Sequence, residues 1–270
     1  MAFLSPDQIT KRMVDAGAKK ASMSVRNALI LGFLGGAFIS LGFLLDIRVI
    51  GNLPKEWGSF SSLLGGAVFP IGLMLVVIAG GELLTGNMMA LPMAIFAKRA
   101  TFLQLVRNWL LILGSNFVGA VFVAYFFGHV VGLTETGTYL EKTIAIAQAK
   151  VDEPFIAALI SGIGCNWLVC LAIWMAFGAD DIGSKILAMW FPIMGFVAIG
   201  FQHIVANMFV IPAAIFAGQL SWTDYLSNFV PVFIGNGIGG GIYVGLMYWM
   251  VHKETVEQAV SSVRKVKKAG

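Results

Sequence analysis

Residues 81–97 read GELLTGNMMALPMAIFA, and residues 201–217 read FQHIVANMFVIPAAIFA. Seven of the seventeen aligned positions are identical, including the Asn-Met pair, the proline and the Ile-Phe-Ala ending. The correspondence continues downstream with the same spacing, since Asn108 matches Asn228. The chain therefore contains two copies of one unit, and each copy includes this segment.

The composition around these segments is that of a membrane protein. Of the 270 residues, 58% are apolar and 12% are charged, whereas a soluble globular protein carries about 25% charged residues. A transmembrane helix needs about 20 mainly apolar residues. The runs that meet this need are 27–45, 58–97, 108–134, 154–179, 186–223 and 225–251, and the only charged residue within them is Glu82. The sequence thus predicts an all-α integral membrane protein with six transmembrane helices, and it gives no basis for nucleic-acid binding.

The two copies are expected to have opposite orientations in the membrane. Each copy contains three spans (27–134 and 154–251), and an odd number of spans inverts the second copy relative to the first. The second and fifth runs are too long for one simple crossing, so we expect helices 2 and 5 to be broken, near residues 81–87 and 201–207. Inverted repeats with broken helices place a transport pathway at the bilayer midplane. The asparagine of each motif is expected to cap the half-helix that follows the break.

Basic residues predict which ends of the spans face the cytoplasm. They concentrate in residues 1–26, 98–107 and 252–270. The positive-inside rule therefore places both termini in the cytoplasm of a plasma-membrane protein, with Asp46–Glu56 and Glu135–Glu153 outside. The first of these basic segments starts with a capping box and has a basic, amphipathic pattern, which predicts a helix on the inner leaflet. The last is expected to form a cytoplasmic tail.

Polar groups at membrane depth indicate function, because they are costly there. His203 lies in the second expected break, opposite the position of Thr85 in the first. A titratable imidazole and a neutral hydroxyl donor about the midplane suit a small monovalent anion. Asn166, in the middle of the fourth span, is expected to hold His203 or to line the route. Glu82 has no cationic residue in the spans to pair with, so we interpret it as protonated or as hydrogen-bonded by its own loop.

Three motifs in order resemble the formate/nitrite transporter family. They are Glu-Leu-Leu-Thr-Gly-Asn at 82–87, Asn-Trp-Leu-Val-Cys-Leu-Ala-Ile-Trp at 166–174 and Phe-Gln-His-Ile-Val-Ala-Asn-Met-Phe-Val-Ile-Pro at 201–212. The resemblance covers essentially the whole chain. It implies an aquaporin-like fold in a homopentamer with one pore per protomer, and a channel or proton-coupled transporter for formate or a similar small anion.

The resemblance also implies roles for individual residues. Thr85 is similar to the loop threonine of the family, and His203 is similar to its central histidine. Leu83, Leu84 and Phe196 would form an outer constriction, Phe69 and Leu73 an inner one, and Lys150 would attract anions on the outer side. The residues expected to shape the loops are Glu82, Asn87, Gln202 and Asn207. Many members carry glutamate before the histidine, where this chain has Gln202, so we expect a weaker tendency of the histidine to protonate.

Other functions fit the residues less well. Nitrite, hydrosulfide or another short monocarboxylate would suit the same site as formate. A water or glycerol pore of the aquaporin type has Asn-Pro-Ala at both half-helix starts, whereas Asn87 and Asn207 are followed by methionine. A membrane enzyme needs a nucleophile–base pair or a metal cluster, and one buried histidine supplies neither. Cys165 and Cys170 are five residues apart on one expected helix, where they point in different directions, so we expect no disulfide between them. They have no neighbouring histidine or acid at ligand spacing, so we expect no metal site, and we expect no cofactor.

Overall fold

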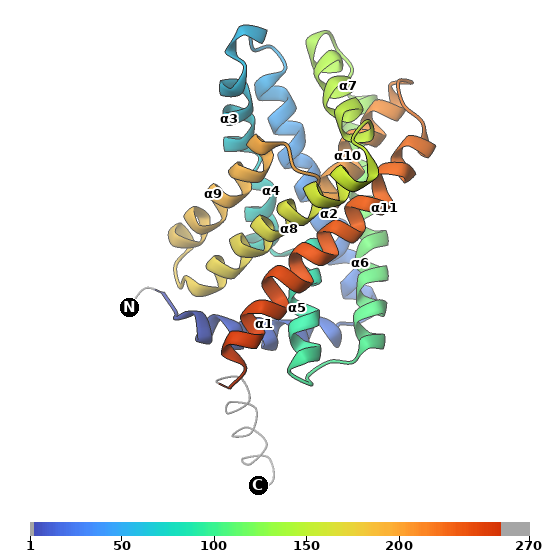
Figure 1. The fold of residues 1–270 in the computed structure, drawn as a ribbon. Coiled ribbons are helices and arrows are strands. Elements are labelled where there is room, and N and C mark those ends of the chain that lie inside the picture. The colour runs from blue at the N-terminus through green and yellow to red at the C-terminus, as the bar shows by residue number, and fades with distance from the viewer. Residues whose placement is uncertain (1–2, 255–270) are drawn as a thin grey trace, which may run out of the picture.

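The computed structural model describes residues 3–254 and is helical apart from short connections (Figure 1). Within this part of the chain, six helices are long and apolar enough to cross a membrane, as the sequence predicts. They are α2 (Val25–Ile50); α3 (Ser59–Val68) with α4 (Ile71–Met74) and η2 (Leu75–Gly80); α6 (Phe102–Phe122) with η3 (Val123–Val130); α8 (Phe155–Gly178); α9 (Ile182–Ile199); and α11 (Trp222–Ile238), which continues through η4 (Gly239–Leu246) to Glu254. Residues 255–270, most of the predicted tail, lie outside the described residues.

Two of the six spans end at a break inside the protein, and a short helix starts after each break. Residues 81–83 separate η2 from α5 (Leu84–Phe96), and residues 200–203 separate α9 from α10 (Ile204–Phe216). The two short helices run toward opposite ends of the molecule (Figure 1). The predicted breaks in helices 2 and 5 are confirmed, and they are shorter than predicted.

The predicted asparagine caps are wrong. The residues that precede the first turns of α5 and α10 are Leu83 and His203, both with extended backbone, whereas Asn87 and Asn207 lie a full turn inside the helices. Each asparagine amide instead reaches back to the break, where it donates to the side chain at position 82 or 202. The polar side chain of the break folds over the first helical turn, and this brings it within reach of the amide.

Two further asparagines attach the breaks to neighbouring helices. Asn116 of α6 accepts from the Leu84 amide at 3.0 Å and donates to the carbonyls of Glu82 at 2.8 Å and Gly32 at 2.7 Å. Asn236 of α11 makes the same three bonds in the other copy, to Ile204, Gln202 and Gly162. Backbone groups that leave the helical pattern at membrane depth must find partners inside the protein, and these side chains supply them.

A helix outside the membrane spans begins each copy. α1 (Pro6–Ala21) lies at one end of the molecule, which we call the α1 end, and α7 (Thr138–Val151) lies at the opposite end, the α7 end (Figure 1). Asn108 donates to the carbonyl of Lys20 near the end of α1, and Asn228 donates to the carbonyl of Lys150 near the end of α7. The match between the copies therefore extends to α1 and α7, beyond the predicted units 27–134 and 154–251.

The N-terminal helix is part of the packed structure. α1 has the predicted capping box, formed by Ser5 and Gln8, and one of its faces is buried. Gly17 permits the closest approach to α5, because a Cβ atom there would lie 2.0 Å from the carbonyl oxygen of Ala90. The amphipathic pattern is therefore explained by protein contact on the apolar face.

Ion pairs gather the basic segments at the α1 end. Arg99, which follows α5, binds Asp15 of α1 at 3.0 Å, and Arg12 binds Asp180 of the connection between α8 and α9 at 3.4 Å. The N-terminal helix and the start of the basic segment 98–107 thus lie at the same end, as the sequence predicts. All four side chains are substantially exposed, so each pair contributes at most about 1 kcal/mol of stability.

Candidate functional site

The two breaks bring Thr85 and His203 into contact. The Thr85 hydroxyl lies 3.1 Å from Nε2 of His203, and the two side chains are 0% and 2% exposed. Nδ1 of the same ring accepts from the backbone N–H of Ala206 at 3.1 Å, which makes the imidazole the side-chain cap of α10. An acceptor nitrogen carries no proton, so the neutral ring has its proton on Nε2 and donates it toward Thr85.

This geometry leaves the threonine hydroxyl free to donate. Because Thr85 Oγ1 accepts from the imidazole, its own proton can point to a third group. Phe196 stacks on the imidazole with ring centroids 5.7 Å apart and an angle of 22°. A second proton on the ring would break the cap bond to Ala206, so the surroundings of His203 favour the neutral form.

The backbone of Thr85 is held by Asn166. The amide of Asn166 donates to the Thr85 carbonyl at 3.2 Å and to the Asn236 carbonyl at 2.7 Å. The expectation that Asn166 holds His203 is wrong, because its side chain has no hydrogen bond to His203 among residues 3–254 and supports the opposite break instead; that it lines the route stays a prediction. Asn166 acts through the position of the threonine.

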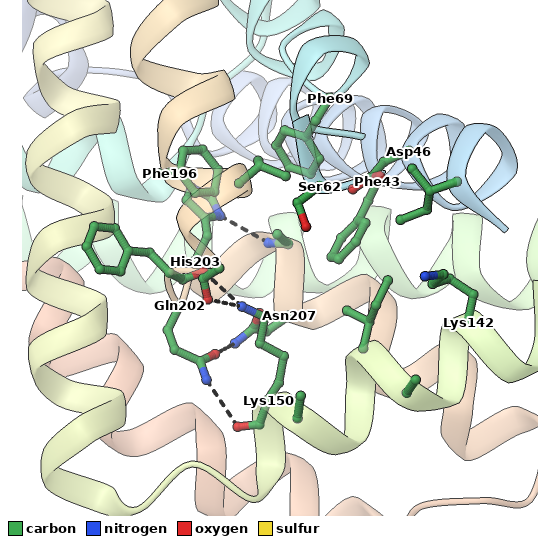
Figure 2. A pocket seen from close by; sticks show the side chains of 18 of the residues that line it. Phe43, Asp46, Ser62, Phe69, Lys142, Lys150, Phe196, Gln202, His203 and Asn207 are labelled. Carbon is green, nitrogen blue, oxygen red and sulfur yellow. Dashed lines mark hydrogen bonds between the residues drawn. The ribbon is translucent and has the colours of Figure 1, made fainter. Parts of the chain in front are cut away.

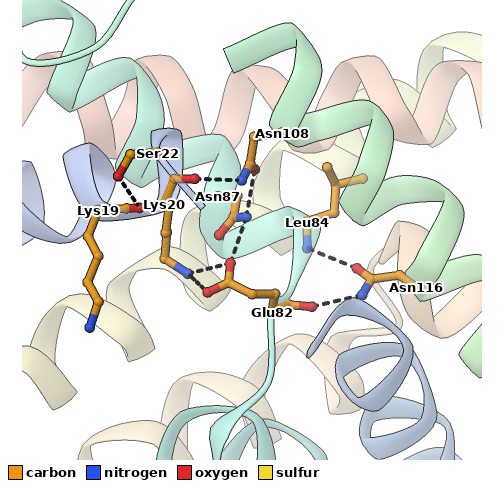
Figure 3. Close-up of polar contacts among 8 residues, drawn as sticks. All are labelled: Lys19, Lys20, Ser22, Glu82, Leu84, Asn87, Asn108 and Asn116. Atoms are coloured by element: carbon orange, nitrogen blue, oxygen red, sulfur yellow. Dashed lines mark hydrogen bonds and ion pairs between the residues drawn. The ribbon is translucent and has the colours of Figure 1, made fainter. Parts of the chain in front are cut away.

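Glu82 has a cationic partner that sequence reasoning did not find. The ammonium group of Lys20 lies 2.7 Å from both carboxylate oxygens, and the Asn87 amide donates to one of them at 2.9 Å (Figure 3). The interpretation of Glu82 as protonated or held by its own loop is therefore wrong, because α1 brings in a charge from outside the spans. Asn87 also donates to Asn108, which fixes the amide between two acceptors.

The second break repeats this arrangement with the uncharged side chain of Gln202 in place of Glu82. Gln202 accepts from the Asn207 amide at 2.7 Å and donates to the Lys150 carbonyl at 3.1 Å (Figure 2). It also donates to the Glu153 carboxylate. The Lys150 ammonium group donates to the carbonyls of Gly200 and Phe201, at 2.7 and 2.9 Å. These carbonyls directly follow the C-terminal end of α9, where the helix dipole favours a positive charge. Burial lowers the pKa of this ammonium group below that of a solvated lysine.

Two cavities approach the pair from opposite ends. The cavity at the α7 end has a volume of about 500 Å³ and includes His203, Phe69, Phe196 and Lys150 in its lining (Figure 2). The cavity at the α1 end has a volume of about 180 Å³. Leu83 and Lys20 are among its lining residues. A buried hydrogen-bonding pair between two such cavities is the arrangement of a transport pathway.

Comparison with known proteins identifies this architecture. The family model described as formate/nitrite transporter matches residues 7–250. The chain belongs to the formate/nitrite transporter family. It is 61% identical to the formate channel BtFdhC of Bacillus thuringiensis over 94% of this chain and 98% of that protein.

Solved structures agree with the family assignment. One, described as an FNT family ion channel, aligns with a TM-score of 0.84 at 31% identity, over 90% of this chain and 98% of that one. Another, described as a pentameric formate channel with formate bound, aligns with a TM-score of 0.74 at 31% identity, over 84% and 97%. This member of the formate/nitrite transporter family is therefore a multi-pass membrane protein with the fold of these channels.

The expected constrictions of this transporter-family protein need correction. Phe69 and Phe196 were expected at opposite ends, yet their rings touch edge to face with centroids 5.6 Å apart, and both line the α7-end cavity. Leu83, expected beside Phe196, lines the α1-end cavity instead. Leu73 and Leu84 are buried and are not among the lining residues of these two cavities, so their part in a constriction stays a prediction. Spacing along the chain does not reveal which side of a break a residue faces, and only the path of the broken helix does.

Asp46 is a cavity residue that sequence reasoning missed. It was expected in an external segment because it follows the last apolar residue of the first run, but α2 continues one more turn to Ile50. Its side chain is 3% exposed and lines the α7-end cavity with Lys142. Helical spacing was the available signal, since Asp46 lies three residues after Phe43 and therefore on the same face.

Proposed function

We propose that this protein conducts small monovalent anions across the membrane, with formate as the first candidate. Nitrite, hydrosulfide and other short monocarboxylates are the alternative substrates of the same site. The observation that carries the proposal is the buried Thr85–His203 pair between two cavities, with a hydroxyl proton available to an anion. The name of the Bacillus thuringiensis relative supports formate.

The proposed path begins at the α7-end cavity, where cationic side chains favour the approach of an anion. Lys142 and Lys150 line this cavity. The rings of Phe69 and Phe196 then oppose an ion, because a carboxylate without partners in an apolar surrounding costs many kcal/mol. A formate that reaches the pair accepts a hydrogen bond from Thr85 and takes up a proton from a hydronium ion of the cavity water, which the imidazole orients, and the neutral acid passes the remaining apolar segment.

Several broader properties belong to the same proposal. The protein acts by transport and catalyses no reaction, and it works as a homopentamer in the plasma membrane with both termini in the cytoplasm. The pentameric assembly of the solved formate channel supports the pentamer, and the basic segments at the α1 end support the orientation. Each pore lies within one chain, because both members of the central pair, Thr85 and His203, come from the same chain.

Uptake into proteoliposomes tests the proposal. Vesicles with purified protein receive isotope-labelled formate, nitrite, hydrosulfide, acetate or lactate, at the same pH on both sides. We expect formate to equilibrate many times faster than in empty vesicles, and glycerol permeability to stay at the level of the empty vesicles. Rapid glycerol flux without anion flux would contradict the proposal and would favour an aquaporin-type pore.

A further inference from the structure

Asp46 is a buried acid on the route to the pair, and the proposed function does not use it. Its carboxyl oxygen Oδ1 has no hydrogen-bond partner among residues 3–254. Gly65 of α3 makes room for this oxygen, since a Cβ atom there would lie 2.1 Å from it. The packing of α2 against α3 therefore accommodates the side chain, although no group among residues 3–254 donates a hydrogen bond to Oδ1.

Few charged or titratable groups surround Asp46. The charged or titratable groups that share its cavity are Lys142 and Lys150 of α7, Glu153 after α7 and His203 before α10. α3 and α10 carry no titratable residue, and Arg48 of α2 stacks on the ring of Tyr139. Figure 2 shows Lys142 beside the same part of the cavity as Asp46, whereas Gln202 and Lys150 lie at the other part. Of the two lysines that line the cavity, Lys142 therefore lies on the same side as Asp46.

A carboxyl group in this position has opposite effects on an anion in its two protonation states. The ionised form repels an anion in the cavity, and burial strengthens the repulsion because the effective dielectric constant is lower than in water. The protonated form is uncharged and has an O–H that can donate to the anion. The two forms therefore differ in how readily they admit the substrate.

We propose that Asp46 is a specificity-determining residue whose protonation admits small monovalent anions to the α7-end cavity and whose ionisation excludes them. The inference rests on the proposed function, because it concerns the approach to the Thr85–His203 pair. Asp46 exchanges its proton with the water of the cavity. This proton stays at the cavity and is distinct from any proton that crosses the membrane with the substrate. The substrates are the anions of weak acids, which are still abundant in their ionised form at a pH where Asp46 is protonated.

The test measures formate exchange at equal pH on both sides, between about pH 5 and about pH 8, where carboxyl and imidazole groups titrate. Asp46→Asn imitates the protonated carboxyl in size and keeps a hydrogen-bond donor. We expect it to raise exchange at the alkaline end roughly tenfold over the wild type and to change it little at the acidic end, because one repulsive charge has been removed. Asp46→Glu retains the charge and should keep the decline with pH.

A matched control separates the local charge from the net charge. Glu56 is exposed in the connection η1 (Lys55–Trp57) at the α7 end and lines neither cavity. Glu56→Gln should therefore leave the pH profile of exchange as in the wild type. A wild-type profile in correctly folded Asp46→Asn overturns the inference while the proposed function stands. If the wild type exchanges no formate at any pH, the proposed function itself fails.

Discussion

At the scale of single residues, His203 performs two tasks with its two ring nitrogens, and substitution can separate them. Asparagine has a side-chain oxygen and is among the best helix caps, so His203→Asn should retain the α10 cap that Nδ1 provides. We predict that this variant melts close to the wild type and that formate uptake loses the pH dependence that stems from the imidazole. The measurements are uptake at several pH values and thermal unfolding in detergent.

His203→Phe serves as the comparison. It removes both nitrogens, so we expect no anion flux and the loss of about 1 kcal/mol from the missing cap, while the oligomer still assembles. A phenylalanine variant that transports formate at the wild-type rate with the wild-type pH profile would show that the imidazole is dispensable.

Thr85 offers a second prediction at this scale, because its hydroxyl and its carbonyl have different partners. Asn166 binds the carbonyl, so the position of the break does not depend on the hydroxyl. Thr85→Val should therefore preserve the fold at a cost of about 1–3 kcal/mol, which reflects the unsatisfied Nε2–H of His203. We expect formate uptake to fall at least about tenfold, since a lost hydrogen bond to a charged group is worth roughly 1.5–3 kcal/mol.

Thr85→Ser is the matched control, because it restores the hydroxyl. Uptake by the serine variant should return toward the wild-type rate. Equal uptake by the valine and serine variants would remove the hydroxyl from the proposed path.

At the scale of elements, α1 is joined to the first break by the Lys20–Glu82 ion pair, whereas the second break has Gln202 at the matching position. Lys20 is 22% exposed and Glu82 is 8% exposed, so removal of the lysine leaves a largely buried carboxylate without its cation. We predict that Lys20→Met destabilises the protein by about 2–4 kcal/mol, near the lower limit for a fully buried pair. Thermal unfolding in detergent measures the effect.

The double variant Lys20→Met/Glu82→Gln tests whether the charge itself matters. It gives the first break an uncharged amide at position 82, as the second break has at position 202, so we expect it to recover most of the lost stability. If the double variant is as unstable as the single one, the side chain of Lys20 stabilises α1 by packing, and the ion pair contributes little.

At the scale of the whole molecule, the pore within each chain leads to a prediction about mixed oligomers. Wild-type and His203→Phe chains, co-expressed in known ratios, should form oligomers in which each wild-type protomer transports independently. Formate uptake per oligomer should then fall in proportion to the fraction of variant chains, and native mass spectrometry should show five protomers. A loss steeper than this proportion would mean that the protomers share one pathway.

Much of the architecture follows from the sequence alone. Runs of about 20 apolar residues must be helical in a membrane, because the bilayer offers no partners to the backbone. The repeated segments therefore predicted both breaks, and with them the position of Thr85 opposite His203. These features depend on local composition and on the symmetry of the repeat, which the order of the residues contains.

Other features were decided by the tertiary structure. Lys20 and Glu82 are 62 positions apart, and their contact exists because α1 folds back against α5. Asp46 is a cavity residue because α2 continues past the apolar run and packs on α3, so its surroundings come from distant segments. The grouping of Phe69 with Phe196 depends on which way the broken helices lead from the midplane. Such contacts arise from packing between elements far apart in the chain, and no local pattern of residues encodes them.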